Sequence, residues 1–407
     1  MSQNAQPMAA NKPRILVTTS TFPRWPGDTD PPFVYQLCAG LSDRFDIHVL
    51  APHQAGCKTA ETLNGIHVHR YRYAPERLEI LAYDGGMLQR IRANPFNILI
   101  LPGFLLAQCF ALLRLQHSFR FELVHSHWII PQGLIAAVCA RKFMLTSHGG
   151  DLFALRSGIL KLLKRWVLRR AKLVTVVSST MRDECLALGV PAENIRVRSM
   201  GVDTKTLFTP PQDRNDEARE GLLYVGRLVE KKGVPVLLRA LAILKERGIT
   251  PKLTIVGDGP DRDSIEQITS GLGLDTDVSF AGALSQDQLP DFYRRASIFI
   301  LPSIVSSDGD QEGLGLVTIE AMACGCPVVA SALPAVMDVV ADGVNGLLAT
   351  PGCAESLAER IEALMADKEL RRVLSCVGLT RARSFDWKAI CEDYGHFIDE
   401  AIGEPQE

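Results

Sequence analysis

Short apolar runs alternate with longer amphipathic stretches along the whole chain of 407 residues. The short runs are rich in valine, isoleucine and leucine, which is typical of strands that are buried on both faces of a parallel sheet. The longer stretches have the apolar spacing of helices that cover such a sheet. The pattern therefore predicts an α/β protein built from doubly wound, Rossmann-like parallel sheets.

The expected strands fall into two series with a linker between them. We expect strands at residues 14–19, 46–51, 67–72, 123–127, 143–147, 173–178 and 195–199, and then at 222–226, 252–257, 278–282, 298–303 and 326–331. The stretch that joins the two series is rich in proline and charge, as linkers are. We therefore expect an N-terminal domain over 1–205, a C-terminal domain over 206–385, and a last helix within 386–407 that packs back on the N-terminal domain. Two such domains would face each other across a central cleft at the carboxyl ends of their strands.

Composition limits the partners that the protein can have. The formal net charge is −2 and the sequence pI is about 6.5, so nothing attracts nucleic acid in general and a bound anion needs a local site. The ten cysteines have no CxxC pair or regular spacing, which is typical of reduced thiols. The polar N-terminus lacks the apolar core of a signal peptide. We expect a cytoplasmic protein that does not bind nucleic acid.

The stretch QEGLGLVTIEAMACG (311–325) contains two glutamates that are separated by seven residues. Glu320 is the only charged residue between Gly313 and Ala330, inside an expected helix. A buried carboxylate without a partner is strongly destabilising, so Glu320 needs donors. The two hydroxyls of a ribose would supply them, and an ion pair with a distant lysine is the alternative.

Two cations lie in an adjacent loop of the same expected domain. Arg227 and Lys232, in YVGRLVEKKG (224–233), follow an expected strand and therefore lie at the cleft. Two cations beside glycines suit a diphosphate, although a solvated loop with ordinary surface charges would look similar. The helix that contains Glu320 begins near Gly313 and Gly315, and its N-terminus would also favour phosphate oxygens.

These motifs, together with VGDGP (256–260) and GALSQDQLPDFYRRASIFILPS (282–303), resemble the nucleotide-sugar half of the retaining glycosyltransferases of family four. This is the large set of group 1 glycosyl transferases with a GT-B fold, and the resemblance covers nearly all of residues 221–350. It implies that Arg227 and Lys232 hold the donor diphosphate, that Glu320 binds the ribose, and that Glu312 contacts the donor sugar. The backbone of Gly313, Leu314, Gly315 and Leu316 would lie near the phosphates.

The resemblance also implies a histidine after a central strand of the N-terminal domain. His148 in TSHGGD (146–151), with Asp151 beside it, fits that place, although a structural histidine is the alternative. Gly27 is the one glycine in the loop after the first strand, where many family members carry two glycines near the donor phosphates. His125 and His127 alternate on one strand, and without a third ligand at useful spacing we expect them to line the core or the cleft.

No metal or other cofactor is expected. Asp308 and Asp310 resemble a metal-binding DxD motif, but GT-B enzymes of this kind use cationic side chains in place of a divalent ion. We interpret both as polar loop residues.

Two segments suggest contact with a membrane. Residues 98–113 are uncharged but shorter than the roughly 20 apolar residues of a spanning helix, and Pro102 and Gly103 interrupt them, which favours a buried or interfacial element. KLLKRWVLRRAK (161–172) interleaves basic and apolar residues without an acid, so it is either an ordinary surface helix or a helix that lies on an anionic membrane. Attachment to the inner face of the cell membrane is thus a hypothesis.

The function we expect is transfer of a hexose, with retention, from a UDP- or GDP-sugar to a saccharide or lipid-linked acceptor. His148, Arg227, Lys232 and Glu312 would carry the reaction. The alternatives are a nucleotide-sugar 2-epimerase of the same fold, a sensor that binds a sugar nucleotide without catalysis, and an NAD-dependent dehydrogenase. The dehydrogenase fits poorly, because Arg262 stands where a GxGxxG fingerprint needs its third glycine.

Overall fold

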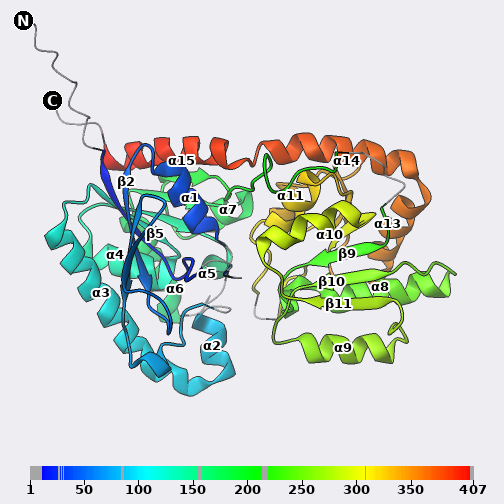
Figure 1. Cartoon of the computed structure of the whole chain (residues 1–407), viewed down its shortest axis with the longest axis horizontal. Coiled ribbons are helices and arrows are strands. Elements are labelled where there is room, and N and C mark those ends of the chain that lie inside the picture. Colours follow the sequence, from blue (N-terminus) through cyan, green and yellow to red (C-terminus); the bar gives the residue numbers. More distant parts are fainter. Residues whose placement is uncertain are drawn as a thin grey trace, which may run out of the picture.

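The computed structural model describes residues 12–25, 28, 30, 32–83, 87–153, 158–212, 219–307 and 309–403. Over these residues the chain forms two sheets side by side, each covered by helices on both faces (Figure 1). We refer to the half with the first sheet as the N-terminal domain and to the half with the second as the C-terminal domain. The α/β class expected from the sequence is confirmed.

The first sheet has the strand order β3-β4-β2-β1-β5-β6-β7-β8. Its strands are β1 (Arg14–Thr18), β2 (Asp46–Pro52), β3 (Ala60–Leu63), β4 (Ile66–Tyr71), β5 (Leu123–His127), β6 (Phe143–Ser147), β7 (Leu173–Val176) and β8 (Ile195–Val197). Adjacent strands are parallel except for β3 and β4, which form an antiparallel hairpin at one edge.

The strand β3 and its turn into β4 are the part of this sheet that was not expected. The two-residue turn consists of Asn64 and Gly65, which both have positive φ angles, of 47° and 83°. Asn-Gly is the dipeptide that such tight turns favour. The strand before the turn, β3, lies at the edge and carries no apolar run, so hydrophobic patterning could not reveal it.

Helices of the N-terminal domain connect these strands and cover the sheet. They are α1 (Phe33–Leu41), α2 (Met87–Ala93), α3 (Leu101–Ser118), α4 (Leu134–Cys139), α5 (Gly150–Phe153), α6 (Gly158–Arg170) and α7 (Ser179–Ala187). Short 3-10 turns at Glu76–Leu78, Pro95–Ile100 and Ala192–Asn194, and a π-helical turn at Ile129–Gly133, complete the connections.

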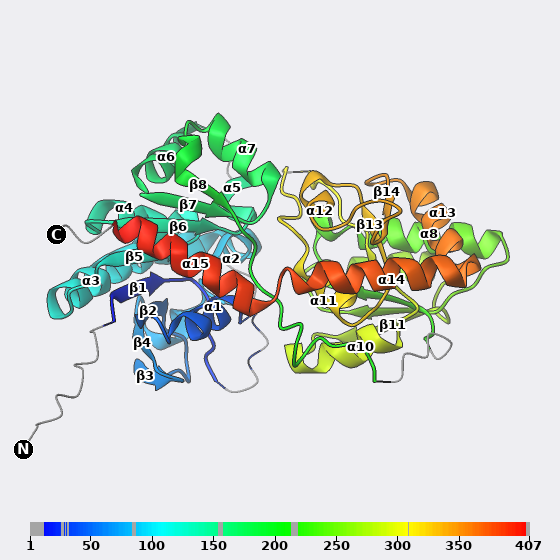
Figure 2. The same ribbon diagram turned by 90° about the horizontal axis from the view of Figure 1, so that it is seen from above.

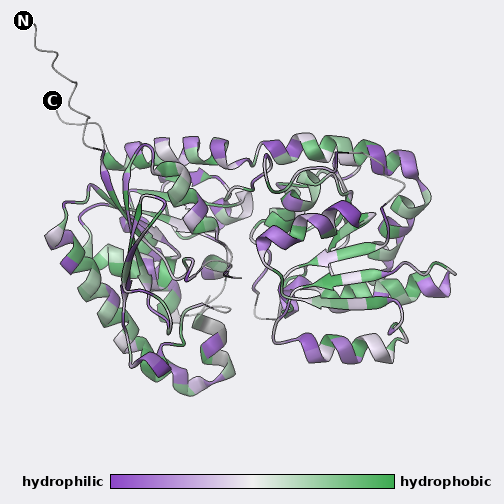
Figure 3. Cartoon of the chain, in the orientation of Figure 1, coloured by the Kyte–Doolittle hydropathy of each residue, from purple (hydrophilic) through white to green (hydrophobic). Residues whose placement is uncertain are grey.

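The second sheet is parallel throughout, in the order β11-β10-β9-β12-β13-β14. Its strands are β9 (Leu222–Val225), β10 (Leu253–Val256), β11 (Val278–Gly282), β12 (Ile298–Leu301), β13 (Val328–Ser331) and β14 (Leu347–Ala349). Their residues are mainly apolar (Figure 3), and β9, β12 and β13 are buried along their whole length, as expected for strands covered on both faces. The strand β14, with three residues, was too short to be expected from the sequence.

The C-terminal domain is covered by α8 (Val234–Glu246), α9 (Arg262–Gly271), α10 (Leu289–Arg295), α11 (Leu316–Ala323), α12 (Pro334–Met337), α13 (Ala354–Ala366) and α14 (Lys368–Arg383). Short 3-10 turns lie at Glu230–Lys232 and Gln286–Gln288. The last helix, α15 (Trp387–Ile402), follows α14 but lies over the N-terminal domain, where it packs against α1 (Figure 2). Asp386, at the start of α15, forms an ion pair with Lys205 at 2.6 Å.

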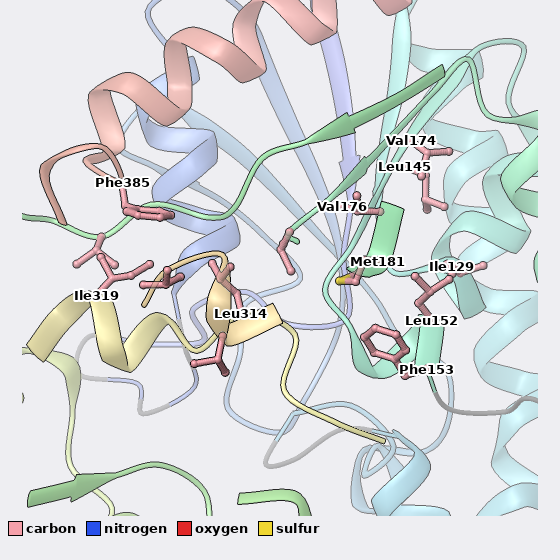
Figure 4. Packing of buried hydrophobic residues seen from close by; sticks show 14 of the residues in the cluster. Ile129, Leu145, Leu152, Phe153, Val174, Val176, Met181, Leu314, Ile319 and Phe385 are labelled. Carbon is pink, nitrogen blue, oxygen red and sulfur yellow. The ribbon is translucent and has the colours of Figure 1, made fainter. Parts of the chain in front are cut away.

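The two domains touch through apolar and polar contacts. One hydrophobic cluster contains Met181 of α7 together with Leu314 and Phe385 of the C-terminal domain (Figure 4). At the rim of this junction, the backbone N–H and hydroxyl of Ser179 donate to the carboxylate of Asp338 at 2.6 and 2.7 Å. The loop after β6 and the loop before α11 meet at this junction, because a Cβ atom added to Gly149 would lie 3.0 Å from Cα of Gly313.

The apolar run at 98–113 is part of a longer helical segment than expected. Residues Pro95–Ser118 span 24 residues with a mean hydropathy of 2.1 in their most apolar window, which is enough by length and composition to cross a membrane. One face of α3 is nevertheless built into the N-terminal domain, because Phe104, Gln108 and Leu112 are fully buried. The segment is thus an element of the fold whose opposite face is apolar and exposed.

Candidate active site

The predicted site residues lie on loops that follow strands of both sheets. Arg227 and Lys232 follow β9, Glu312 precedes α11, and His148 follows β6. The loops come very close: a Cβ atom added to Gly313 would lie 2.7 Å from the backbone oxygen of His148. The structure therefore brings together, at the junction of the domains, residues that are more than 150 positions apart.

Lys232 and Glu312 form the closest charged contact at this junction. The Lys232 ammonium lies 2.5 Å from Oε2 of Glu312, and both side chains are largely buried. Burial alone would raise the pKa of Glu312, but the charges of Lys232 and Lys231 outweigh it and the pKa is lowered. The neighbouring Lys231 pairs with Asp310 at 3.0 Å. Two ammonium groups and two carboxylates thus form one compact cluster beside α11.

Backbone packing against two glycines fixes the loop that carries Arg227. A Cβ atom at Gly257 would lie 1.9 Å from the carbonyl oxygen of Gly226, and one at Gly259 would lie 2.2 Å from that of Leu228. Backbone hydrogen bonds from Gly226 to Val256 and from Leu228 to Asp258 tie the same segments together. The glycines of VGDGP therefore allow two loops to touch. This packing explains why glycine stands at both positions, and no dinucleotide-binding fingerprint is needed to explain it.

Arg227 is half-buried and lies close to the N-terminal domain. Burial lowers the pKa of its guanidinium, the nearby Asp30 opposes that shift, and Arg90 adds to it. Asp30 belongs to the loop after β1, and Arg90 belongs to α2. The charges that act on Arg227 therefore come from the N-terminal domain, across the junction.

Glu320 is buried in α11 and accepts hydrogen bonds from neutral groups. The Tyr293 hydroxyl donates to its Oε2 at 2.9 Å, and Gln286 donates as well. Among the described residues no lysine pairs with it, so the ion pair considered as an alternative is not present. Burial raises the pKa of Glu320 to about 7, although both hydrogen bonds act in the opposite direction.

The partners of Glu320 were missed in the sequence, although Tyr293 and Gln286 both lie within the segment 282–303 that carries the family resemblance. Gln286 in turn accepts a hydrogen bond at 3.2 Å from Gln36 of α1, across the domain junction. The acid that we expected to bind ribose is therefore connected to the N-terminal domain through one amide side chain.

Replacing Glu320 by glutamine should remove the pH dependence of stability that this acid contributes. The folded-state pKa of Glu320 is raised to about 7 from 4.5, so its favourable contribution is present below pH 4.5 and is lost as the pH rises through 7. At pH 8 the Glu320→Gln variant should be more stable than the wild type by about 2–3 kcal/mol, measured by urea unfolding.

Glu312→Gln is the matched control, because the pKa of Glu312 is shifted downward. Its carboxylate contributes stability above its unfolded pKa, and that contribution is lost as the pH falls. This variant should therefore lose stability at pH 8. Equal effects of the two variants at pH 8 would show that the environments of the two acids do not differ as described.

His148 lies among aromatic side chains and forms a hydrogen bond with a second histidine. Nδ1 of His127 lies 2.9 Å from Nε2 of His148, and the two rings are stacked. The rings of Phe33 and Trp128 also contact His148, with centroids 4.9 Å away. Burial lowers the pKa of His148 to about 3, so its ring is neutral at physiological pH.

The hydrogen bond between the histidines favours one tautomer. Nε2 of His127 is buried and has no hydrogen-bond partner among the described residues. A buried N–H without an acceptor is rarer in proteins than an unsatisfied acceptor. We therefore assign the shared proton to Nδ1 of His127, which places the proton of His148 on its own Nδ1.

Asp151 shapes the loop that carries His148. Its carboxylate accepts hydrogen bonds from the Ser147 hydroxyl at 2.8 Å, from the His148 backbone N–H at 3.2 Å and from the Ile129 backbone N–H at 2.9 Å. Asp151 is thus a positioning residue. His125 bonds to Thr146 within the core at 2.8 Å, as expected for a core histidine.

Some of the remaining predicted residues lie at the domain junction, and the others lie outside the residues that the structure describes. Gly315 has a φ of 86° and immediately precedes α11, whose first residue is Leu316. Leu314 is buried in the interdomain cluster, so its side chain packs and only its backbone could reach a ligand. Gly27 and Asp308 lie outside the described residues.

Comparisons with known proteins match both halves of the chain. The family model described as glycosyl transferases group 1 matches residues 208–376, and the model described as glycosyltransferase family 4 matches residues 32–206. A sucrose-phosphate synthase structure from Thermosynechococcus elongatus superposes with a TM-score of 0.77 and 23% identity, covering 95% of this chain and 98% of that one. The fold is therefore GT-B.

Three curated relatives illustrate the range of similar proteins. An uncharacterized glycosyltransferase of Methanocaldococcus jannaschii is 29% identical over 66% of this chain and 72% of its own length. An amylovoran biosynthesis glycosyltransferase of Erwinia amylovora is 34% identical over 46% of each chain. A GDP-mannose-dependent phosphatidylinositol monomannoside mannosyltransferase of Mycolicibacterium smegmatis is 30% identical over 59% of this chain and 65% of its own. The matches to the last two thus span about half to two thirds of the relatives.

Proposed function

Because the chain belongs to the glycosyltransferase family that the group 1 and family 4 models describe, we propose that it transfers a hexose from a nucleotide sugar to a saccharide or lipid-linked acceptor with retention. The observation that carries this proposal is that Lys232 lies beside the start of α11, while Arg227, on the same loop, lies close to the N-terminal domain. Positive groups in that arrangement suit an anionic diphosphate leaving group.

Departure of the diphosphate is the step that these groups would assist. As the bond between the sugar and the diphosphate breaks, negative charge grows on the leaving oxygen. Arg227 and Lys232 stabilise that charge without a metal ion. Lys232 is already fixed by Glu312 at 2.5 Å, so little reorganisation is needed when the donor binds.

The acceptor hydroxyl attacks from the face that the diphosphate leaves, which gives retention. Glu312 contacts a hydroxyl of the donor sugar, and the neutral His148 offers its Nδ1–H to the sugar or the acceptor. Closure of the two domains at Gly149 and Gly313 excludes water from the reacting centre. Glu320 accepts hydrogen bonds from the ribose, and Gln286 and Tyr293 hold it in place.

The donor classes we propose are UDP- and GDP-hexoses. GDP-mannose is the donor named for the mycobacterial relative, and that relative and the amylovoran enzyme act in glycolipid and polysaccharide synthesis respectively. We infer the same general role, in the synthesis of cell-surface glycans or glycolipids.

A direct assay tests the proposal. The purified chain is incubated with radiolabelled UDP-glucose, UDP-galactose, UDP-N-acetylglucosamine and GDP-mannose, with and without a membrane extract as the source of acceptor. Label that appears in a larger product only with acceptor supports transfer, and NMR of the product's anomeric carbon reports retention. Release of free sugar without acceptor would instead indicate the 2-epimerase. No observation on the described residues favours that activity.

We also propose that the N-terminal domain attaches to the inner face of the cell membrane. The outer face of α3 and the segment before it expose Phe96, Leu99, Leu106 and Phe110. The helix α4 contacts both α3 and α6, so α6 lies on the same side of the domain. On α6, Ile159, Leu162 and Trp166 are exposed among basic residues. Apolar side chains beside cations suit an anionic lipid surface.

A cavity of about 320 Å³ beside this face supports the same proposal. It lies between β4 and α3, and Arg72, Phe110 and Arg114 are among the residues that line it. Arg72 and Arg114, at an opening next to the exposed Phe110 side chain, suit the phosphate of a lipid headgroup.

The Phe110→Ser variant should partition into anionic vesicles about tenfold more weakly than the wild type. A buried phenylalanine contributes roughly 1.5–3 kcal/mol, and Phe110 is 70% exposed, so its loss should not disturb the fold. The measurement is co-sedimentation with phosphatidylglycerol vesicles at low salt. Val373→Ser, an exposed apolar position on α14, is the control and should bind as the wild type does. Failure of the wild type to sediment would refute attachment.

A further inference from the structure

Three potential metal ligands converge at the outer end of the N-terminal sheet. Asp46 and His48 lie two residues apart on β2 and therefore share one face of the sheet. His67 is the residue of β4 that pairs with His48 in the parallel register. One ligand atom from each of the three lies within 4.8 Å of the others. Neither the family resemblance nor the catalytic proposal gives this group a role.

The distances suit a small coordination sphere. Oδ1 of Asp46 lies 3.6 Å from Nε2 of His48 and 3.8 Å from Nε2 of His67. Ligands of a tetrahedral zinc ion, each at about 2.0–2.1 Å from the metal, are roughly 3.3 Å apart. The two spacings to Asp46 exceed that value by a few tenths of an ångström, and all three ligand atoms lie within 4.8 Å of one another. A small movement of the half-exposed His67 side chain toward the other two groups would therefore seat an ion between them.

The residues around the cluster leave Oδ1 of Asp46 and Nε2 of His48 in position to coordinate an ion. Arg14 pairs with Oδ2 of Asp46 at 3.0 Å, so Oδ1 is the oxygen that faces the histidines. The other ring nitrogen of His48, Nδ1, lies 3.2 Å from His69. A hydrogen bond at the far nitrogen is what orients histidine ligands in metal sites, and it directs Nε2 of His48 toward Asp46.

The site is rigid on one side and open on the other. The His48 side chain is 5% exposed and packs against the rings of Phe119 and Phe121. The side chains of His67 and Asp46 are 47% and 29% exposed. An ion can therefore enter from solvent, and water can complete its coordination.

We propose that Asp46, His48 and His67 bind one divalent transition-metal ion of the zinc class. Two imidazoles and one carboxylate select zinc, cobalt or nickel over magnesium and calcium, which prefer oxygen ligands throughout. The site lies at the amino ends of β1 and β2, whereas the donor site lies beyond the carboxyl ends of the strands. The ion therefore joins β2 to β4, and to β1 through Arg14, and takes no part in sugar transfer.

The test uses the full chain after treatment with EDTA and desalting. Titration with ZnCl₂ in a calorimeter gives stoichiometry and affinity, and Co²⁺ absorption in the visible range reports the ligand geometry. His67→Ala is the informative variant because His67 is half exposed and tolerates truncation. His396→Ala, an exposed histidine on α15, is the matched control. Circular dichroism checks that each variant is folded.

We expect one ion per chain in the wild type and in His396→Ala, with affinity at least about tenfold weaker in His67→Ala. Asp46→Asn should show a comparable loss. Equal affinity and equal cobalt spectra in the wild type and in His67→Ala would overturn the proposal. A near-ultraviolet band from cobalt bound to thiolate would do the same, because it would assign binding to cysteines.

Discussion

The Lys232→Ala variant should turn over the nucleotide-sugar donor about 100-fold or more slowly than the wild type, and it should also be less stable. Loss of one preorganised donor to a developing oxyanion typically costs 10²–10³ in kcat. The structure adds the second effect, since Lys232 lies 2.5 Å from the buried carboxylate of Glu312. Removing one partner of a buried pair leaves an uncompensated charge, which costs roughly 3–5 kcal/mol.

A double variant separates these two effects. Lys232→Ala combined with Glu312→Gln leaves no buried charge at the pair, so much of the stability measured by urea unfolding should return while turnover stays low. Lys231→Ala is the control, because Lys231 pairs with Asp310 in a more exposed place and should lose far less stability. If Lys232→Ala retained wild-type kcat, Lys232 would have no part in stabilising the leaving group.

A methyl group at Gly313 should reduce kcat by about 100-fold with little change in the separate domains. The added Cβ would lie 2.7 Å from the backbone oxygen of His148, so the two loops would have to move apart. Misplacement of reacting groups by about 1 Å can cost 10²-fold in rate. The measurement is kcat of Gly313→Ala with saturating donor and acceptor.

Gly150→Ala is the matched control for Gly313→Ala. Gly150 lies two residues after His148, and an added Cβ there would meet no atom within 4 Å. It should keep wild-type kcat. Equal rates in the two variants would show that contact between these loops does not contribute to the reaction.

Hydrophobic patterning predicted most of the fold because parallel strands in this protein are short, apolar and covered on both faces. The strands β9, β12 and β13 are buried along their entire length, so each leaves an uninterrupted signal in the sequence. The strand β3 leaves none, because it lies at a sheet edge and owes its place to the Asn64–Gly65 turn. The three-residue strand β14 is too short to stand out.

The sequence predicted a site residue where that residue differs in character from the rest of its segment. Glu320 stood out as the one charge in an apolar helix, but the sequence could not show that Tyr293 and Gln286 donate to it. Those contacts depend on how α10 and α11 pack. In the same way, the pairing of His127 with His148 requires β5 and β6 to be neighbours in the sheet, which no local pattern states.

The contact between Lys232 and Glu312 shows a second reason why the sequence could not predict the whole site. From the sequence, both residues were assigned separate contacts with a donor, one to the diphosphate and one to the sugar. The structure joins them directly at 2.5 Å, across 80 residues of chain. Their roles are therefore coupled, and the folding of a Lys232 variant cannot be taken for granted.

Calorimetric binding of a nucleoside diphosphate and of its nucleoside tests the central claim most directly. UDP and uridine, and GDP and guanosine, are titrated into the wild type and into Arg227→Ala. If cations at the domain junction hold the diphosphate, one diphosphate should bind about 100-fold or more tightly than its nucleoside, and Arg227→Ala should reduce that ratio by about tenfold or more. Equal affinities for diphosphate and nucleoside in the wild type, or an unchanged ratio in Arg227→Ala, would contradict the account.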